Sequence, residues 1–202
     1  MIKKTLTTIE DPLRYLQNTR PGQNIDLIRS ACIDGSKVPA YIIRELNGCG
    51  VNGAACLAAF ASGGSLSFDD SLKRCLGIAE GGFTRLRNGV TDYYTRLGRE
   101  APFVRRCLKA VSACHTARSS LFVKRRAVKE ILAGRPVLLN IALSSQYKDH
   151  TVTAYGFEEY SVGPRSEKLL FFKVRDGYSE EDRYLLYKGI LGISITYLKM
   201  HA

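Results

Sequence analysis

A run of small residues between two glycine-containing turns constrains this chain more than any other feature. Residues Cys49–Ala61 are mostly Gly, Ala and Cys, and they follow Asn47-Gly48 and precede Gly63-Gly64. Glycines next to such a run mark where a helix begins and ends, so we predict one helix over it. Because small side chains on every side let other elements approach closely, we expect this helix at the centre of a domain.

The size and composition of the chain fit one folded domain. It has 202 residues, of which 45% are hydrophobic and 24% are charged, which is ordinary globular usage and enough for a buried core. We therefore treat residues 1–202 as a single domain. Within it we expect a loosely structured lead-in over 1–37, a helical basic insertion over 63–123 and a mainly β subdomain over 124–202.

The order of the elements indicates an α+β fold. Helical periodicity extends from Phe68 to Gly134, and short β-rich apolar runs separated by turn residues follow it. Helices followed by strands are typical of a helical layer packed on an antiparallel sheet. The expected strands are Val137–Leu143, Thr151–Tyr155, Leu169–Val174, Tyr184–Tyr187 and Ile193–Leu198.

The net charge of +11 belongs to one part of the chain. Fourteen basic and three acidic residues lie between Lys73 and Lys129, so this segment accounts for the whole excess. Such a segment is either a solvated helical face or a surface for an acidic partner, an anionic membrane or nucleic acid. Sparse aromatic residues and the lack of an RNA-binding signature disfavour nucleic acid.

Cysteine usage and the N-terminus bear on the compartment. The six cysteines are widely spaced and form no CxxC pair, which disfavours a disulfide scaffold, a zinc site and a thioredoxin-type motif. No apolar run is long enough to span a bilayer, and the first residues carry two lysines but no apolar secretion signal. We expect a cytoplasmic protein, or a secreted one if a signal sequence has been removed.

Among the three histidines, His150 is the one placed to carry a proton. It stands at the start of an expected strand, whereas His115 lies in a polar stretch read as helical and His201 lies next to the chain end. If the following hairpin is centred on Gly163, His150 lies opposite Asp176. Opposed Cβ atoms are about 4.5–5.5 Å apart, so this carboxylate could orient the imidazole.

A cysteine at the start of the small-residue helix is the candidate nucleophile. Cys49 would lie at the positive end of the helix dipole, which lowers the pKa of a thiol, and nearby backbone N–H groups could hold an oxyanion. Cys56 lies two turns further on and reads as a buried, inert thiol. A structural interpretation is also open, with Cys49 as a packing residue, His150 as an edge histidine and Asp176-Gly177 as a turn.

At these positions the sequence resembles the bacterial papain-like cysteine peptidases, the branch that contains double-glycine leader peptidases and streptopain. Asn47–Phe60 resembles their nucleophile helix, Gly134–Ala142 followed by Asp149–Phe157 their histidine-bearing strands, and Phe171–Tyr178 the strand that ends in the third catalytic residue. The resemblance covers about residues 38–62 and 124–198. It implies a papain-like fold, with a central N-terminal helix packed on a C-terminal antiparallel sheet.

The resemblance also implies roles for single residues. Cys49 would be the nucleophile, His150 the general base and acid, and Asp176 the group that orients the imidazole. Many members of the family have Gln six residues before the nucleophile as an oxyanion donor, where this chain has Ile43. Asn47 is the candidate to supply an amide instead, or the Cys49 N–H could act alone.

The expected function is cleavage of a peptide bond in a peptide or protein substrate by a Cys-His-Asp triad, with neither cofactor nor metal. If the likeness to leader peptidases extends to specificity, small residues flank the scissile bond. One alternative is an inactive papain-like binding module whose basic helical face, including Arg105, Arg118, Arg125 and Lys129, docks an acidic partner or nucleic acid. The other is an acyl transferase on the same fold.

Overall fold

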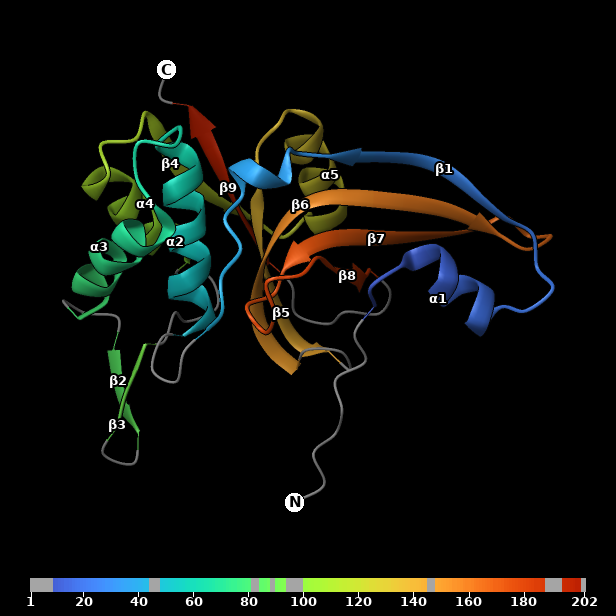
Figure 1. The fold of residues 1–202 in the computed structure, drawn as a ribbon, viewed down its shortest axis with the longest axis horizontal. Coiled ribbons are helices and arrows are strands. Elements are labelled where there is room, and N and C mark those ends of the chain that lie inside the picture. The colour runs from blue at the N-terminus through green and yellow to red at the C-terminus, as the bar shows by residue number, and fades with distance from the viewer. Residues whose placement is uncertain are drawn as a thin grey trace.

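The structure is a computed structural model that describes residues 9–43, 48–80, 84–87, 90–93, 100–144, 148–187 and 194–200. These residues form a mixed α+β fold in which helices pack on a twisted sheet (Figure 1). The helices are α1 (Pro12–Thr19), α2 (Cys49–Ala61), α3 (Phe68–Glu80), α4 (Glu100–Ala110) and α5 (Val123–Leu132), with a short 3-10 turn at Gly35–Lys37. The strands are β1 (Ile25–Cys32), β2 (Thr84–Arg87), β3 (Val90–Tyr93), β4 (His115–Ser120), β5 (Val137–Ser144), β6 (Lys148–Val162), β7 (Glu167–Arg175), β8 (Arg183–Leu186) and β9 (Ser194–Met200).

A seven-stranded antiparallel sheet organises the molecule. Its strand order is β4-β9-β5-β6-β7-β8, and β1 also pairs with β6. The first half of β6 pairs with β5 and the second half with β1, so this long strand carries two neighbours on one edge. β2 and β3 form a separate two-stranded sheet. The predicted α+β class, the central helix and the antiparallel C-terminal sheet are confirmed.

Helices cover both faces of this sheet. Along β5, Val137 and Leu139 belong to the core that contains the buried side of α5, whereas Leu138 between them belongs to the core formed with α2, α3 and α4. Because side chains alternate between faces along a strand, α2 and α5 lie on opposite faces. α2 therefore occupies the layer between the sheet and the outer helices α3 and α4 (Figure 1).

The small residues of α2 allow its close approach to the sheet. All residues from Gly50 to Ala59 are buried. A Cβ atom placed on Gly53 would lie 2.9 Å from Cδ2 of Leu138, closer than a normal van der Waals contact. Glycine at this position therefore lets α2 approach β5 as closely as observed without displacing the Leu138 side chain, and this approach brings the first turn of α2 to β6.

Two sequence-based expectations are wrong. The segment expected as a loosely structured lead-in contains α1 and β1, and β1 is part of the main sheet. The segment expected to be helical contains the β2–β3 pair and also β4, which pairs with β9 and places His115 on a strand. Most side chains of β1 are exposed and β4 is polar, so their membership in the sheet depends on backbone pairing, which hydrophobic periodicity does not record.

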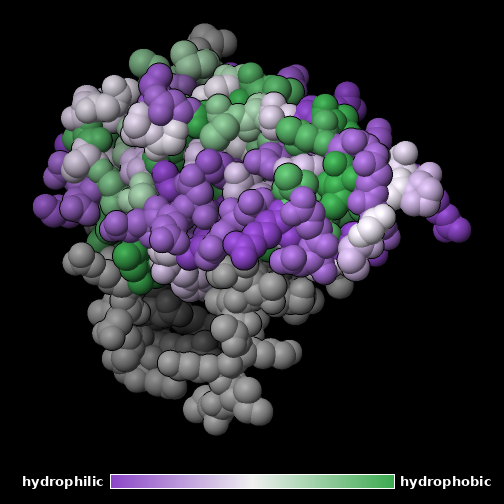
Figure 2. Space-filling model, turned by 45° about the vertical axis from the view of Figure 1, so that its right-hand side comes forward, coloured by the Kyte–Doolittle hydropathy of each residue, from purple (hydrophilic) through white to green (hydrophobic). Residues whose placement is uncertain are grey.

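Hydrophilic and hydrophobic side chains gather in separate regions of the surface. In the view of Figure 2, hydrophilic side chains form a band across the middle of the described surface, with hydrophobic side chains gathered above it. No helix within the described residues has both the length and the apolar composition needed to cross a bilayer. The organisation of residues 1–202 as a single domain, with segment bounds at residues 37, 63 and 123, stays a prediction.

Candidate active site

Cys49 is the first residue of α2 and is half-buried. The helix begins there because Gly48, with φ −53° and ψ 147°, has an extended backbone and caps it, and the first N–H to bond back is that of Val51, to the Gly48 carbonyl. The N–H groups of a first helical turn have no acceptor within the helix, and the helix dipole is positive there. The Cys49 thiol therefore lies in an environment that favours a thiolate.

His150 is brought to this thiol by β6. It pairs with Ile141 of β5 in the sheet, it is 6% exposed, and its imidazole forms a hydrogen bond with the Cys49 side chain. The backbone N–H of the next residue, Thr151, donates to Cys49 Sγ at 3.3 Å. The sulfur thus receives contacts from two successive residues of one strand, which fixes its position relative to the imidazole.

Asp176 contacts the other side of the imidazole through its backbone. Nε2 of His150 lies 2.7 Å from the Asp176 carbonyl oxygen. Because a carbonyl only accepts hydrogen bonds, Nε2 carries a proton, and Nδ1 is the nitrogen that can exchange a proton with Cys49. The buried Asp176 carboxylate accepts the N–H of Tyr178 at 2.9 Å, which holds the turn that presents the carbonyl.

The electrostatics of the pair favour charge separation. Burial raises the pKa of the Cys49 thiol, but the hydrogen bond and charge of His150, with the Thr151 N–H, outweigh it and lower the pKa below its ordinary value. Burial lowers the pKa of His150, but the contact with Cys49, the Asp176 carbonyl and the Asp176 carboxylate outweigh burial and raise the pKa. A lowered thiol pKa beside a raised imidazole pKa is the signature of a thiolate–imidazolium pair.

The predicted pairing of His150 with Asp176 across the hairpin is wrong. Val162 lies opposite Glu167, so the hairpin has a four-residue turn centred beyond Gly163, and a bulge near Gly156 shifts the register again. Beyond the last pair, Thr153 with Arg175, the register points His150 toward Tyr178. The imidazole and the Tyr178 ring are stacked with centroids 4.8 Å apart. Asp176 still reaches His150 because it begins the turn after β7.

The sequence offered Asn47 or the backbone N–H of Cys49 as donors to an oxyanion, with Ile43 where the family often has Gln. Asn47 lies outside the described residues. Ile43, at the position where the family often has Gln, is half-buried, and its backbone N–H donates to the Gly177 carbonyl at 2.8 Å. Its apolar side chain packs against Gly177 and offers no donor. Among the described residues near the thiol, the N–H groups that open α2 are the available donors for a developing oxyanion.

The other thiols have surroundings unlike those of Cys49. Cys56 is fully buried, as predicted, and burial raises the pKa of its thiol to about 12. Cys32 is exposed, and partial burial of its sulfur also raises its pKa. Among the described residues, no group of three His, Cys, Asp or Glu side chains is arranged to hold a metal ion.

Two participants were not singled out from the sequence. Thr151 acts through its backbone N–H, which no residue type can signal. Tyr178 covers one face of the imidazole, and its position two residues after Asp176 could have indicated a role only with the correct register.

Comparison with known proteins supports the fold. No protein-family model and no curated protein matches the sequence. Among solved structures, the crystal structure of a Bacillus anthracis protein provisionally described as a C39-like peptidase is similar, with a TM-score of 0.55 and 15% identity over 86% of this chain and 100% of that chain. The chain therefore shares the mixed α+β fold of that C39-like structure.

Proposed function

We propose that this protein is a cysteine peptidase in which Cys49, His150 and Asp176 form the catalytic group. The observation that carries the proposal is the contact between the Cys49 thiol, at the start of α2, and an imidazole whose Nε2 is held 2.7 Å from the Asp176 carbonyl oxygen. A nucleophile, a base in hydrogen-bond contact with it and a third group that orients the base are the parts that acyl transfer requires.

The chemistry follows from these positions. The Cys49 thiolate attacks the carbonyl carbon of a peptide bond, and the backbone N–H groups at the start of α2 stabilise the oxyanion. The C–N bond breaks as the His150 imidazolium gives its proton to the leaving amine, which leaves a thioester on Cys49. Water then attacks the thioester, His150 takes the proton from that water, and the carboxylic acid leaves with the thiolate restored.

The proposed substrate is a peptide or protein, in keeping with the similarity of the fold to that of a C39-like peptidase. The resemblance to leader peptidases adds a narrower substrate class to the proposal, namely peptides with small residues at the scissile bond. Binding of a reactive group at Cys49 does not by itself distinguish hydrolysis from transfer, so the first test uses thiol reactivity and the second uses product analysis.

Reactivity mapping tests the nucleophile. The protein is treated with iodoacetamide at a series of pH values, and carbamidomethylation of each of the six cysteines is followed by peptide mass mapping. Cys49 should react at a lower pH than the exposed Cys32, because the pKa of Cys49 is lowered and that of Cys32 is raised. Equal labelling of all six thiols in the folded protein would overturn the proposal.

Substrate cleavage tests the reaction. A library of internally quenched peptides is incubated with the protein and with two variants, Cys49→Ala and the matched control Cys32→Ala. Cleavage should disappear in the first variant and persist in the second. Products ending in a free carboxylate establish hydrolysis, whereas transfer of the acyl group to an added amine in place of water would favour a transferase.

A further inference from the structure

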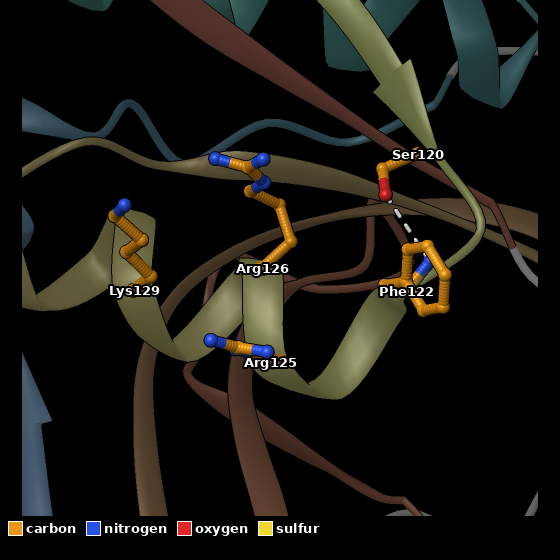
Figure 3. Close-up of a pocket in the computed structure, with 5 residues that line it drawn as sticks. All are labelled: Ser120, Phe122, Arg125, Arg126 and Lys129. Carbon is orange, nitrogen blue, oxygen red and sulfur yellow. Dashed lines mark hydrogen bonds between the residues drawn. The ribbon is translucent and has the colours of Figure 1, made fainter.

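The outer side of α5 is a second surface with a defined shape. Ser120, Phe122, Arg125, Arg126 and Lys129 line a hollow of about 270 Å³ (Figure 3). A neighbouring hollow of about 290 Å³ shares Arg125 and is completed by Arg29, Lys124 and Val128. We call these residues the α5 surface. It lies on the sheet face opposite α2, so it is separate from the Cys49 site.

The α5 surface carries an excess of positive charge. The two carboxylates that pair with its cations, Glu130 and Glu159, are buried, and each bonds two cations. Arg29 and Lys124 lie 2.7 and 2.8 Å from Glu159, and Arg135 and Arg126 lie 2.7 and 3.4 Å from Glu130.

Arg125 and Lys129 differ from those four cations. Both are exposed, and among the residues that the structure describes no carboxylate lies within ion-pair distance of either one. They are four residues apart on α5, so they share one side of the helix. Two unneutralised cations on a hollowed surface favour an anionic ligand.

Apolar side chains accompany these cations. Phe122 forms one wall of the hollow of about 270 Å³ and is 81% exposed, and the adjacent Leu121 is 80% exposed. Leu132, at the other end of α5, is 62% exposed. Free phosphate makes no use of exposed Phe and Leu. A peptide with carboxylates and apolar side chains matches both features, because carboxylates pair with Arg and Lys and aromatic residues anchor interfaces.

The basic segment does not form one continuous surface. α4, which bears the exposed Arg105 and Arg106, packs in the core on the α2 side of the sheet, whereas α5 packs on the other side. The predicted basic face is therefore divided between two sides of the molecule. The hollows described above lie along α5 and include no residue of α4, which locates a docking site more narrowly than the charge count does.

We infer that the α5 surface binds an acidic segment of a protein, with carboxylates against Arg125 and Lys129 and an apolar side chain against Phe122. The inference does not depend on the chemistry of Cys49. The segment belongs to a partner protein and not to the peptide cleaved at Cys49, because the α5 surface lies on the sheet face opposite α2.

The test measures the binding of a fluorescein-labelled synthetic peptide of alternating Glu and Leu by fluorescence anisotropy. The double variant Arg125→Glu with Lys129→Glu should bind about tenfold or more weakly, since both cations of the expected ion pairs become carboxylates that repel the acidic peptide. The matched control, Arg165→Glu with Lys168→Glu, makes the same change in net charge at exposed positions around the β6–β7 turn and should bind within about twofold of the parent.

Further arms separate the alternatives. Phe122→Ser should weaken binding several-fold, and added salt should weaken it further. Equal loss in the control double variant, or no loss in Phe122→Ser, would overturn the inference. Tighter binding of a single-stranded oligonucleotide that is also lost in the Arg125/Lys129 variant would assign the surface to nucleic acid instead. Cys49→Ala should bind the peptide normally, so failure of the peptidase proposal leaves this result unchanged.

Discussion

Nε2 of His150 lies 2.7 Å from the backbone carbonyl oxygen of Asp176, while the carboxylate of Asp176 accepts the N–H of Tyr178. The same residue therefore orients the imidazole with its main chain and holds its own turn with its side chain. The negative charge of the carboxylate adds a long-range contribution that raises the pKa of His150.

Substitution of Asp176 by Asn separates these contributions. Asn can still accept the Tyr178 N–H, and the main-chain carbonyl stays, but the charge is gone. The pKa of His150 should fall, less thiolate should form on Cys49, and alkylation at pH 6 should slow by about tenfold. Asp34→Asn is a matched control, because Asp34 also accepts the N–H two residues on, from Ser36, and it should leave the alkylation rate unchanged.

The pH dependence of the thiol tests the pairing directly. In His150→Ala the largest cause that lowers the pKa of Cys49 is lost and only the Thr151 N–H still opposes burial, so the midpoint of the alkylation profile should move to higher pH. The profile of Cys32 in the same sample serves as an internal control and should not move. An unchanged Cys49 midpoint would show that the imidazole does not stabilise the thiolate.

Peptide cleavage should follow a bell-shaped pH profile. The working form holds one proton on the pair, with thiolate on Cys49 and imidazolium on His150. Below the acid limb the thiol is protonated, and this limb lies below the ordinary pKa of cysteine because that pKa is lowered. Above the basic limb the imidazolium is lost, and this limb lies above the ordinary pKa of histidine because that pKa is raised.

Tyr178 should act as a positioning residue through its ring. The rings of Tyr178 and His150 are 4.8 Å apart and inclined by 14°, so phenylalanine can replace tyrosine in the stack. Tyr178→Phe should keep the parental pH profile. Tyr178→Ala should lower kcat by about two- to tenfold, the range expected from loss of an aromatic pair, and should shift the basic limb. A higher KM with an unchanged kcat would indicate that Tyr178 contacts the substrate instead.

The central helix and the strands of the C-terminal sheet could be predicted because their patterns are local. Gly48 and Gly63 bracket a small-residue run, and α2 covers Cys49–Ala61 as expected. The apolar runs at β5, β7, β8 and β9 fall within about two residues of their predicted bounds. Burial of both faces gives such strands a sequence signal that does not depend on their neighbours.

The register and the sheet edges could not be predicted in the same way. The bulge near Gly156 and the four-residue turn that begins at Gly163 shift the pairing without changing the hydrophobic pattern. A hairpin centred on Gly163 would place Asp176 opposite His150, whereas the observed register directs Tyr178 to that position. The exposed strand β1 has no alternating core face, so only its backbone pairing with β6 reveals it.

The contact between α2 and β5 can be tested with two helix glycines. Gly53→Ala places a methyl group about 2.9 Å from the fully buried Leu138, so it should lower the free energy of unfolding by about 1–3 kcal/mol. Gly77→Ala, at an exposed position of α3 with no atom within 4 Å of the added Cβ, should raise it by about 0.5–1 kcal/mol. Urea unfolding of both variants measures the contrast, and a shift of the same sign in both would contradict it.

Gly177 links the fold to the site, because it follows the Asp176 carbonyl that holds His150. Its φ is +77°, and a Cβ atom would lie 2.6 Å from Ile43 and 2.9 Å from Tyr41. Gly22 has a φ of +73° with no atom within 4 Å, so Gly22→Ala incurs only the backbone strain, about 1 kcal/mol. Gly177→Ala should cost about 1–3 kcal/mol more, since the added atom meets packed neighbours. It should also slow Cys49 alkylation at pH 6, which Gly22→Ala should not. Equal unfolding midpoints and equal alkylation rates in the two variants would show that the turn tolerates displacement and that the Asp176 carbonyl does not fix the imidazole.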